Sequence, residues 1–266
     1  PAIEEEHRFL QDCADEEIPV VLPIQLKNGN TLGRVDSIPF SLFPKKGGRL
    51  FELNSDVDYV RAGALIGRIH LAGGRRSAEH RIILHPEYAL NRDIEYLENS
   101  GAVPEEKKAS FLEICRKISR RITPLFKDVT LKRIHGDCHR GNILDRGGQE
   151  GLCIIDFDDM AMGAAVHDLW MLLPGRISES QVELSLMLEG YTRFSEFDVK
   201  TARLVEPLRA MRIIYFLAWS ARQRGDHRFR EHHPQWGTKQ FWEQEIHDLK
   251  TQYAEIEDSL NMEIML

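Results

Sequence analysis

The chain has 266 residues, of which 42% are hydrophobic and 29% charged, as in a globular protein with enough length for one large domain or two small ones. Its formal net charge of -7 argues against nucleic acid as the main partner. The four cysteines form no C-x-x-C pair, and we find neither a signal peptide nor an apolar run of membrane-spanning length. We therefore expect a cytoplasmic location and no membrane partner.

The chain opens on a predicted amphipathic helix. Its apolar residues recur at roughly helical spacing: Ile3, Phe9, Leu10 and Cys13. Glu5 and Glu6 stand near the helix start, where negative charge is favourable in any case. A solvated acidic face therefore accounts for them without any functional site.

Three short β-rich segments follow. Residues 18–26 and 31–35 flank Asn28-Gly29-Asn30, a turn sequence that predicts a hairpin between them. Two prolines place the first segment at a sheet edge or make it irregular. Residues 38–43 predict a third strand, which a proline- and glycine-rich stretch then ends.

From residue 56 onward the sequence predicts mainly helices. Their apolar residues follow helical spacing over residues 57–69, 105–122, 164–173, 182–194, 199–224 and 239–260. Gly63 and Gly67 predict the close approach of a neighbouring element, and Pro207 predicts a kink. Residues 71–100 carry turn residues and scattered aromatics, which we interpret as a long surface excursion.

The most informative stretch runs from Ile134 to Asp159. It reads I-H-G-D-C-H-R-G-N-I-L, then a glycine turn, then G-L-C-I-I-D-F-D-D. The apolar run L-C-I-I predicts a short strand, with Asp156 at its end. Asp137 and Asn142 lie on the polar loop before it. Carboxylate and carboxamide oxygens on adjacent loops make a poor core but a good site for a hard divalent cation.

Phosphoryl transfer requires this combination of groups. A carboxylate accepts the proton of the attacking hydroxyl, and oxygen ligands hold Mg2+ across the nucleotide's phosphates. In kinases an Asp is followed five residues later by an Asn, and a second Asp follows the next strand. Asp137, Asn142 and Asp156 reproduce that spacing.

Other interpretations of the stretch fit less well. His135 and His139 stand four apart, but no glutamate follows the first of them, as the zinc-protease motif requires. The aspartates after the strand resemble a calcium loop, yet Met160 and Ala161 stand where an oxygen ligand and a glycine are needed. A surface turn of ordinary acidic residues is the plainest alternative.

H-G-D-x-x-x-x-N followed by I-D-F-D resembles the aminoglycoside phosphotransferase and choline kinase family of the protein-kinase-like fold. D-x-D-D, V-x-D-L-W-M-L-L, F-S-E-F-D and E-P-L-R-A-M-R extend the resemblance to bacterial stress-response serine/threonine kinases of this family. It implies an α+β fold. A truncated N-terminal β lobe would cover residues 1–46, with a helix and strands up to the hinge, and a mainly helical catalytic lobe would cover residues 47–266.

The resemblance also implies roles for individual residues. The protein would be an ATP-dependent phosphotransferase in which Asp137 is the base and Asp156 a catalytic metal ligand. Asn142 would be the second Mg2+ ligand, and Asp158 a weaker candidate for a metal contact. Protein Ser/Thr hydroxyls would be the acceptors.

Three further roles concern the surroundings of this site. By resemblance, Glu6, or its neighbour Glu5, would pair with the nucleotide-binding lysine. Phe43 would lie at the hinge against the adenine of ATP. A buried Asp168 would brace the catalytic loop, although an Asp in the first turn of a helix needs no such role.

The motif leaves alternatives open. A small-molecule kinase acting on choline, homoserine or an aminoglycoside carries the same loop, and a non-catalytic scaffold could retain it. Arg209 and Arg212 suit either the acidic site, a substrate phosphate or a structural ion pair. No glycine-rich loop or strand-borne lysine precedes the first helix. We therefore expect a protein made of residues 1–266 alone to bind Mg-ATP weakly. We also expect the strands that carry the glycine-rich loop and the lysine to stand upstream in a longer protein.

Overall fold

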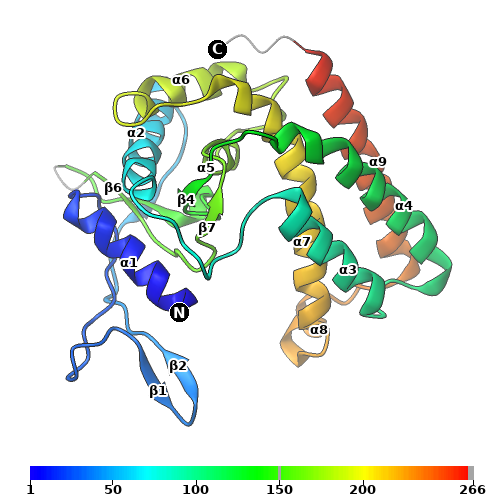
Figure 1. The fold of residues 1–266 in the computed structure, drawn as a ribbon, viewed down its shortest axis with the longest axis horizontal. Coiled ribbons are helices and arrows are strands. Elements are labelled where there is room, and N and C mark those ends of the chain that lie inside the picture. The colour runs from blue at the N-terminus through cyan, green and yellow to red at the C-terminus, as the bar shows by residue number, and fades with distance from the viewer. Residues whose placement is uncertain (149–150, 263–266) are drawn as a thin grey trace. The chain divides into compact units, whose positions relative to one another are not determined.

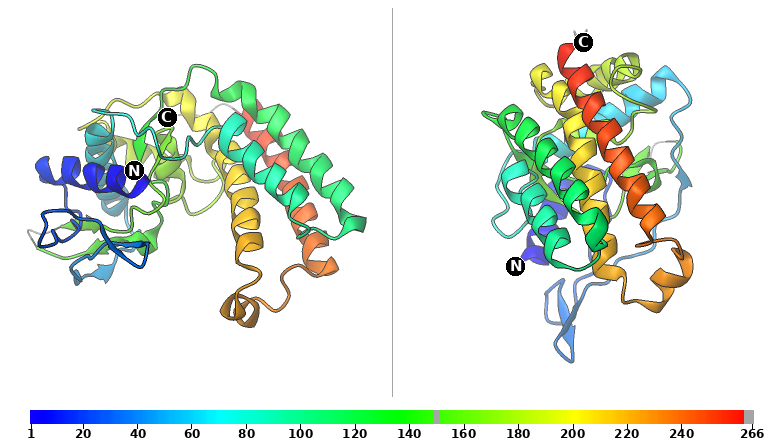
Figure 2. Two further views of the ribbon diagram at one scale, coloured as in Figure 1. Left: turned by 60° about the horizontal axis from the view of Figure 1, so that its bottom comes forward. Right: turned by 90° about the vertical axis from the view of Figure 1, so that its right-hand side faces the viewer.

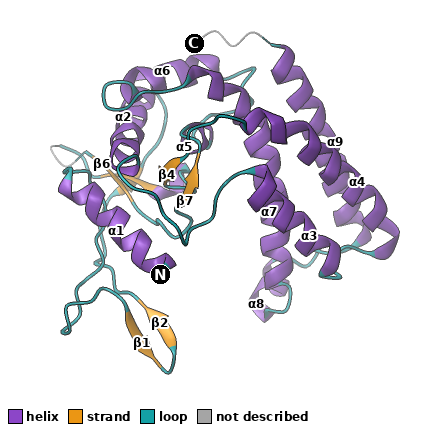
Figure 3. Cartoon of the chain, in the orientation of Figure 1, coloured by secondary structure: helices purple, strands orange, loops and turns teal. Residues whose placement is uncertain are grey.

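The computed structural model describes residues 1–148 and 151–262, which form two compact units (Figure 1). The first unit comprises Pro1–Ile82 and Thr130–Thr201. The second comprises Ile83–Val129 and the described residues from Ala202 onward. All strands of the described residues belong to the first unit, as the secondary-structure colours in Figure 3 show. The lobe boundary expected near residue 46 does not coincide with a boundary between the two units, and it stays a prediction.

The first unit begins with helix α1, Ala2–Asp15, as the apolar spacing predicted. Phe9, Leu10 and Cys13 are buried on one side of the helix. Glu5 and Glu6 are also buried, with 7% and 5% of their surface exposed. A solvated acidic face is therefore wrong for these two glutamates.

The hairpin lies further along the chain than the sequence suggested. Strands β1 (Gly33–Val35) and β2 (Ile38–Phe40) pair antiparallel around Asp36 and Ser37, both of which have positive φ. Residues 18–26 form no strand, since two prolines remove backbone donors from that segment. Asn28-Gly29-Asn30 makes a tight turn, with Leu26 N donating to Asn30 O, but the predicted strands do not flank it.

Two small sheets carry the central motif. In one, the strand order is β3 (Arg49–Leu50), β5 (Ile143–Asp145), β6 (Leu152–Ile154), all antiparallel. In the other, β4 (Lys132–Ile134) pairs antiparallel with β7 (Ala161–Gly163). The loop after β4 leads to β5, and the loop after β6 leads to β7. Each of these two loops therefore crosses from one sheet to the other. The loops start and end on neighbouring strands, because β4 pairs with β7 and β5 pairs with β6.

Helices α2 (Asp56–Gly73) and α6 (Gln181–Tyr191) pack closely in the first unit. A Cβ on Gly63 would lie 1.8 Å from the carbonyl oxygen of Met187, and one on Gly190 would lie 2.0 Å from an α2 carbonyl oxygen. Only glycine permits this approach, which confirms the close contact predicted from the glycines of α2. The short helix α5, Val166–Trp170, also contacts both helices.

The second unit is helical. It contains a π-helical turn at Pro86–Leu90 that leads into α3 (Asn91–Asn99), then α4 (Glu105–Ile122) and a 3-10 turn at Thr123–Phe126. The surface excursion predicted for residues 71–100 is therefore wrong: α2 continues to Gly73, and the second part forms α3, whose Ile94 and Leu97 are buried.

The rest of the second unit follows a 3-10 segment, Val199–Leu204. Three helices follow it: α7 (Val205–Gln223), α8 (His227–His232) and α9 (Lys239–Asn261). Pro207 lies in the first turn of α7, where its missing N–H costs nothing, so the predicted kink is wrong. Helices α3, α4, α7 and α9 pack side by side (Figure 2). No helix in the described ranges is long and apolar enough to cross a bilayer.

Candidate active site

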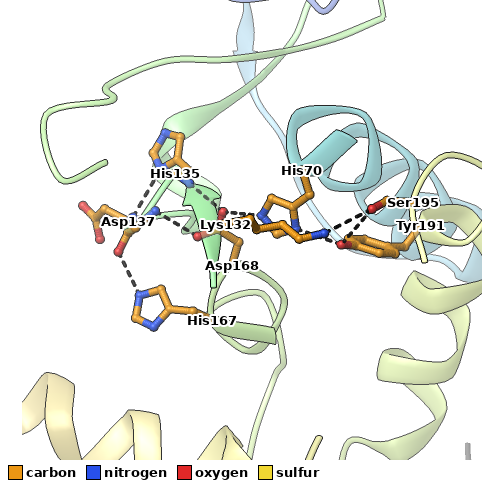
Figure 4. Close-up of polar contacts among 9 residues, drawn as sticks. His70, Lys132, His135, Asp137, His167, Asp168, Tyr191 and Ser195 are labelled. Carbon is orange, nitrogen blue, oxygen red and sulfur yellow. Dashed lines mark hydrogen bonds and ion pairs between the residues drawn. The ribbon is translucent and has the colours of Figure 1, made fainter. Parts of the chain in front are cut away.

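A buried carboxylate holds the backbone of the turn that carries Asp137. Asp168, in α5, is 1% exposed and accepts hydrogen bonds from the backbone N–H of His135 at 2.7 Å and of Gly136 at 2.9 Å (Figure 4). Each carboxylate oxygen therefore holds one amide of the turn. This is the bracing contact that the sequence led us to expect from Asp168.

Asp168 has a further partner, His70, which the sequence reasoning missed. Nε2 of His70 lies 2.9 Å from the carboxylate, and Nδ1 lies 3.1 Å from the hydroxyl of Tyr191. Burial lowers the pKa of His70, so its imidazole is neutral and Nε2–H donates to Asp168. Burial would raise the pKa of Asp168, but the hydrogen bond from His70 and the electrostatic influence of the neighbouring histidines lower it to about 2.

The side chain of His135 joins the two loops of the site. Its Nδ1 accepts from the backbone N–H of Asp137 at 3.2 Å, which leaves the proton on Nε2 to be donated to the carbonyl of Ile155 at 2.9 Å. Ile155 is the residue before Asp156. One buried imidazole therefore ties the backbone of the candidate base to the peptide that carries the candidate metal ligand.

Gly136 brings the same loops into contact through its backbone. Its φ is +86°, and a Cβ there would lie 2.1 Å from the carbonyl oxygen of Asp159. His167 lies with Nε2 3.0 Å from the Gly136 carbonyl. Both the conformation and the space at this position require glycine.

Asn142 ends a 3-10 turn, Arg140–Asn142, and is 7% exposed. Its side-chain N–H donates to the backbone carbonyl of Asp137 at 3.0 Å, and its backbone carbonyl accepts from the backbone N–H of Ile155 at 2.9 Å. The side-chain amide donor is therefore engaged within the loop of Asp137, and the side-chain oxygen remains as a candidate cation ligand. The carboxylate of Asp137 lies 3.4 Å from Nε2 of His139.

A pocket of about 350 Å³ lies beside these loops, within the first unit. Its walls are largely apolar, formed by Leu10, Val21, Phe43, Leu144, Ile155 and Phe157. Three carboxylates, Glu6, Asp156 and Asp158, line it as well, together with Lys45 and Lys46. Four of the residues singled out in the sequence thus share this pocket, while Asp137 and Asn142 lie on the neighbouring loop.

The acidic residues of the pocket influence one another. Burial raises the pKa of Glu6 to about 7; the charges of Asp158 and Asp156 add to the rise, and Arg81 opposes it. Asp156 has a φ of +67°, an uncommon conformation for a residue with a side chain. A divalent cation would relieve this concentration of negative charge, so the oxygen donors fit Mg2+.

The donor set is nevertheless incomplete. Among residues 1–148 and 151–262, no three His, Cys, Asp or Glu side chains cluster as a metal site. Mg2+ is usually held by one or two carboxylates together with substrate phosphates, so a complete protein cage is not needed.

Arg81 is a second residue that the sequence reasoning missed. Its Nη1 lies 3.7 Å from Glu6, and Nε donates to the carbonyl of Met160 at 2.7 Å. Glu6 thus has an arginine near it in this structure. No motif surrounds Arg81, and only its place after a helix in a segment of turn residues could have drawn attention to it.

The arginines of α7 lie in the second unit. Arg209 forms an ion pair of 3.2 Å with buried Glu206, which agrees with the structural alternative for this residue. The guanidinium of Arg212 lies 5.4 Å from the centre of the Tyr215 ring.

Comparison with known proteins identifies the family. A model of the phosphotransferase enzyme family, which groups aminoglycoside phosphotransferase-type proteins, matches residues 1–205. Stress response kinase A of Escherichia coli strain K12 is 37% identical over 239 residues, which cover 90% of this chain and 72% of that protein. The serine/threonine protein kinase RdoA of Salmonella typhimurium strain LT2 is 35% identical over 244 residues, covering 91% and 73%.

The fold agrees with this relationship. The solved structure of amicoumacin kinase hAmiN, in complex with AMP-PNP, Ca2+ and Ami, matches with a TM-score of 0.68 at 18% identity, covering 97% of this chain and 77% of that one. The chain belongs to the phosphotransferase enzyme family and has its protein-kinase-like fold, with small sheets in the N-terminal part and a mainly helical C-terminal part.

Proposed function

We propose that this phosphotransferase transfers the γ-phosphate of ATP to Ser or Thr hydroxyls of protein substrates, in a bacterial stress response. The support for the acceptor is the relatives that match over most of the chain, named as stress response kinase A and as a serine/threonine protein kinase. The support for the chemistry is the loop that carries Asp137 and Asn142.

One observation carries the proposal most directly. His135 links the amide of Asp137 to the peptide before Asp156, and Asn142 links both loops again through its side chain and its carbonyl. A base and two oxygen ligands on a shared rigid frame are what phosphoryl transfer requires, because its catalysis consists mainly of positioning and electrostatic stabilisation.

In the proposed mechanism, the carboxylate of Asp137 accepts the proton of the attacking Ser or Thr hydroxyl. A bond forms between that oxygen and the γ-phosphorus as the bond to the bridging oxygen of ADP breaks, and ADP leaves. Asp137 then releases its proton to solvent. The hydrogen bonds that the backbone N–H groups of the turn donate to Asp168 and to His135 Nδ1 keep the carboxylate in place during this step.

Asn142 and Asp156 would hold Mg2+, with Asp158 as a further contact, and the bound ion would offset the charge of the phosphates. The carboxamide of Asn142 is oriented for this by its hydrogen bond to Asp137 O. Asp156, whose backbone has a positive φ, lines the pocket together with Asp158, which supports this assignment.

The apolar part of the pocket suits the adenine of ATP, with Phe43 against the ring at the hinge. Glu6 would pair with a nucleotide-binding lysine when nucleotide is bound. The analogue AMP-PNP in the solved amicoumacin kinase is consistent with a nucleotide site in this fold.

Incubation of the full-length protein with γ-labelled ATP tests the proposal. We expect label on the protein itself or on a generic Ser/Thr substrate, and a loss of about 100- to 10,000-fold in turnover for Asp137→Asn with little change in ATP affinity. Label only on choline, homoserine or an aminoglycoside would contradict the acceptor, and no label on any acceptor would favour a non-catalytic protein. Unchanged turnover in Asp137→Asn would contradict the base.

A further inference from the structure

A segment outside the motif, residues 78–82, connects α1 to the loop that carries Asp156. The carboxylate of Glu5 accepts from the backbone N–H groups of Glu79 and His80, each at 2.9 Å. On the other side, the carbonyl of Ile82 accepts from Met162 N at 2.9 Å. Helix α1 and residues 156–162 are therefore linked through one short piece of chain.

Arg81 stands at the centre of this segment, with 11% of its side chain exposed. Its guanidinium donates from Nε to the carbonyl of Met160 at 2.7 Å and from Nη2 to the carbonyl of Asp158. Nη1 lies 3.5 Å from the carbonyl of Ala2 and 3.7 Å from Glu6. A planar fork can contact two carbonyls and α1 together, which the single ammonium of a lysine cannot do.

The two loop carbonyls belong to residues two and four positions after Asp156. A left-handed conformation is unfavourable for a residue other than glycine and persists only where its surroundings hold it. His135 binds the carbonyl of Ile155, directly before Asp156. Arg81 binds the carbonyls of Asp158 and Met160, further along the same loop. The loop is thus held on both sides of the strained residue.

We propose that Arg81 is a positioning residue, which clamps the carbonyls of Asp158 and Met160 to α1 and so holds the carboxylates of Asp156 and Asp158 in the position in which they bind Mg2+. This inference deepens the proposed function and rests on it. Arg81 touches neither nucleotide nor acceptor in this scheme. Its removal changes the Mg2+ requirement by releasing the loop.

The matched control is Arg75. It lies close to Arg81 in the sequence and pairs with Glu16, the residue directly after α1, at 2.5 Å, but it is half exposed and its partner lies at the opposite end of the helix from Ala2 and Glu6. Arg81→Met, Arg81→Lys and Arg75→Met are compared in the full-length protein, with circular dichroism and thermal melting to confirm folding.

The first measurement is hydrogen exchange of residues 157–162 in the metal- and nucleotide-free protein. Met160 N donates to Phe157 O within this loop, so release of the clamp exposes a bond that can be observed. We expect exchange to be at least about 10-fold faster in Arg81→Met and unchanged in Arg75→Met. Because no nucleotide is present, failure of the proposed kinase activity would not alter this result.

The second measurement is the Mg2+ concentration that gives half-maximal binding of a fluorescent ATP analogue. Loss of a residue that orients metal ligands typically costs about 10- to 100-fold in metal affinity. We expect that shift in Arg81→Met, a smaller one in Arg81→Lys, and none in Arg75→Met. Asp137→Asn, which alters the base, should lower turnover without shifting the Mg2+ requirement.

A double variant separates clamping from charge neutralisation. If Arg81 served only to balance the charge of Glu6, Glu6→Gln combined with Arg81→Met would restore the wild-type rate of exchange; we expect exchange to remain fast.

A wild-type rate of exchange in Arg81→Met would overturn the inference. If Arg81→Met does not fold, Arg81→Lys decides, since wild-type exchange and Mg2+ dependence with a lysine would show that charge alone suffices. A wild-type protein that binds no nucleotide would instead refute the proposed function.

Discussion

His70 and Asp168 form a buried hydrogen bond of 2.9 Å that joins helix α2 to the base of the catalytic turn. The same carboxylate accepts the amides of His135 and Gly136, so the turn depends on a group with no contact to solvent. Tyr191 extends the arrangement by contacting His70 from the end of α6 and Ser195 at 3.5 Å. The position of Asp137 is therefore tied to the packing of α2 and α6.

Replacement of Asp168 by Asn should destabilise the protein. An amide has one acceptor oxygen in place of two, so at least one of the three buried donors loses its partner, at about 1–3 kcal/mol per unsatisfied group. In a chain of this length, we expect the melting temperature to fall by roughly 2–10 °C. Thermal melting of Asp168→Asn measures the effect, and Asp258→Asn on the exposed side of α9 is a control. An unchanged melting temperature in Asp168→Asn would contradict the bracing role.

The neutral state of His70 predicts a specific pH dependence of stability. Burial lowers its pKa below the value of about 6.5 for an unperturbed histidine, so below that pH the unfolded chain binds a proton that the folded chain does not. This contribution to the free energy of unfolding is complete above that pH and decreases as the pH falls. Asp168, whose folded pKa is about 2 against 3.8, adds a loss only below about pH 4.

The variant His70→Gln isolates the contribution of His70 to the pH dependence of stability. A glutamine can still donate to Asp168 but does not titrate. We expect the free energy of unfolding of the variant to vary less between pH 5 and 7 than that of the wild type, by denaturant titration at several pH values. Equal slopes in the two proteins would mean that the pKa of His70 does not differ between the folded and unfolded chains, which would contradict the effect of burial.

The catalytic loop was predictable because its chemistry depends on short-range spacing. Asp137, Asn142 and Asp156 are close in sequence and on adjacent loops, so a pattern of a few residues identifies them. Asp168 was predicted from the resemblance to kinase-like folds, in which a buried Asp in this region braces the loop. Their specific roles as base and ligands remain predictions.

The residues that hold this site were not predictable for a related reason. His70 is separated from Asp168 by 98 positions and Arg81 from Asp158 by 77, so no local pattern connects them. His70 does interrupt an apolar stripe of α2, which is a weak signal of a buried polar partner. The β1–β2 hairpin was misplaced because Asp36 and Ser37 adopt positive φ without a glycine, whereas Asn28-Gly29-Asn30 carries the stronger turn sequence.

The two aspartates after β6 should differ in their effect on metal-dependent binding. Asp156→Asn and Asp158→Asn remove one charge each, and asparagine tolerates the left-handed backbone at position 156. We expect Asp156→Asn to weaken Mg2+-dependent nucleotide binding more strongly, because the carboxylate at the strand end is the one that the kinase pattern assigns to the phosphates. Isothermal calorimetry at several Mg2+ concentrations compares them, and the reverse order would move the ligand role to Asp158.

Gly136 provides the most direct test of how the two loops meet. An added methyl group would lie 2.1 Å from the carbonyl oxygen of Asp159, and the φ of +86° is unfavourable for any residue with a Cβ. Neither problem is relieved by a side-chain movement, because the obstructing atom belongs to the backbone. We expect Gly136→Ala to cost more than about 1–3 kcal/mol of stability, the usual range for backbone strain alone.

The same substitution should separate the loops at the site. Turnover of Gly136→Ala should fall further than its stability loss explains when it is assayed well below its melting temperature, since Asp137 follows directly. Gly101→Ala is the matched control: its φ is +65°, but nothing lies within 4 Å of the added Cβ. It should lose stability from backbone strain while keeping turnover. Equal turnover in the two variants would show that the contact between Gly136 and Asp159 is not needed to position the base.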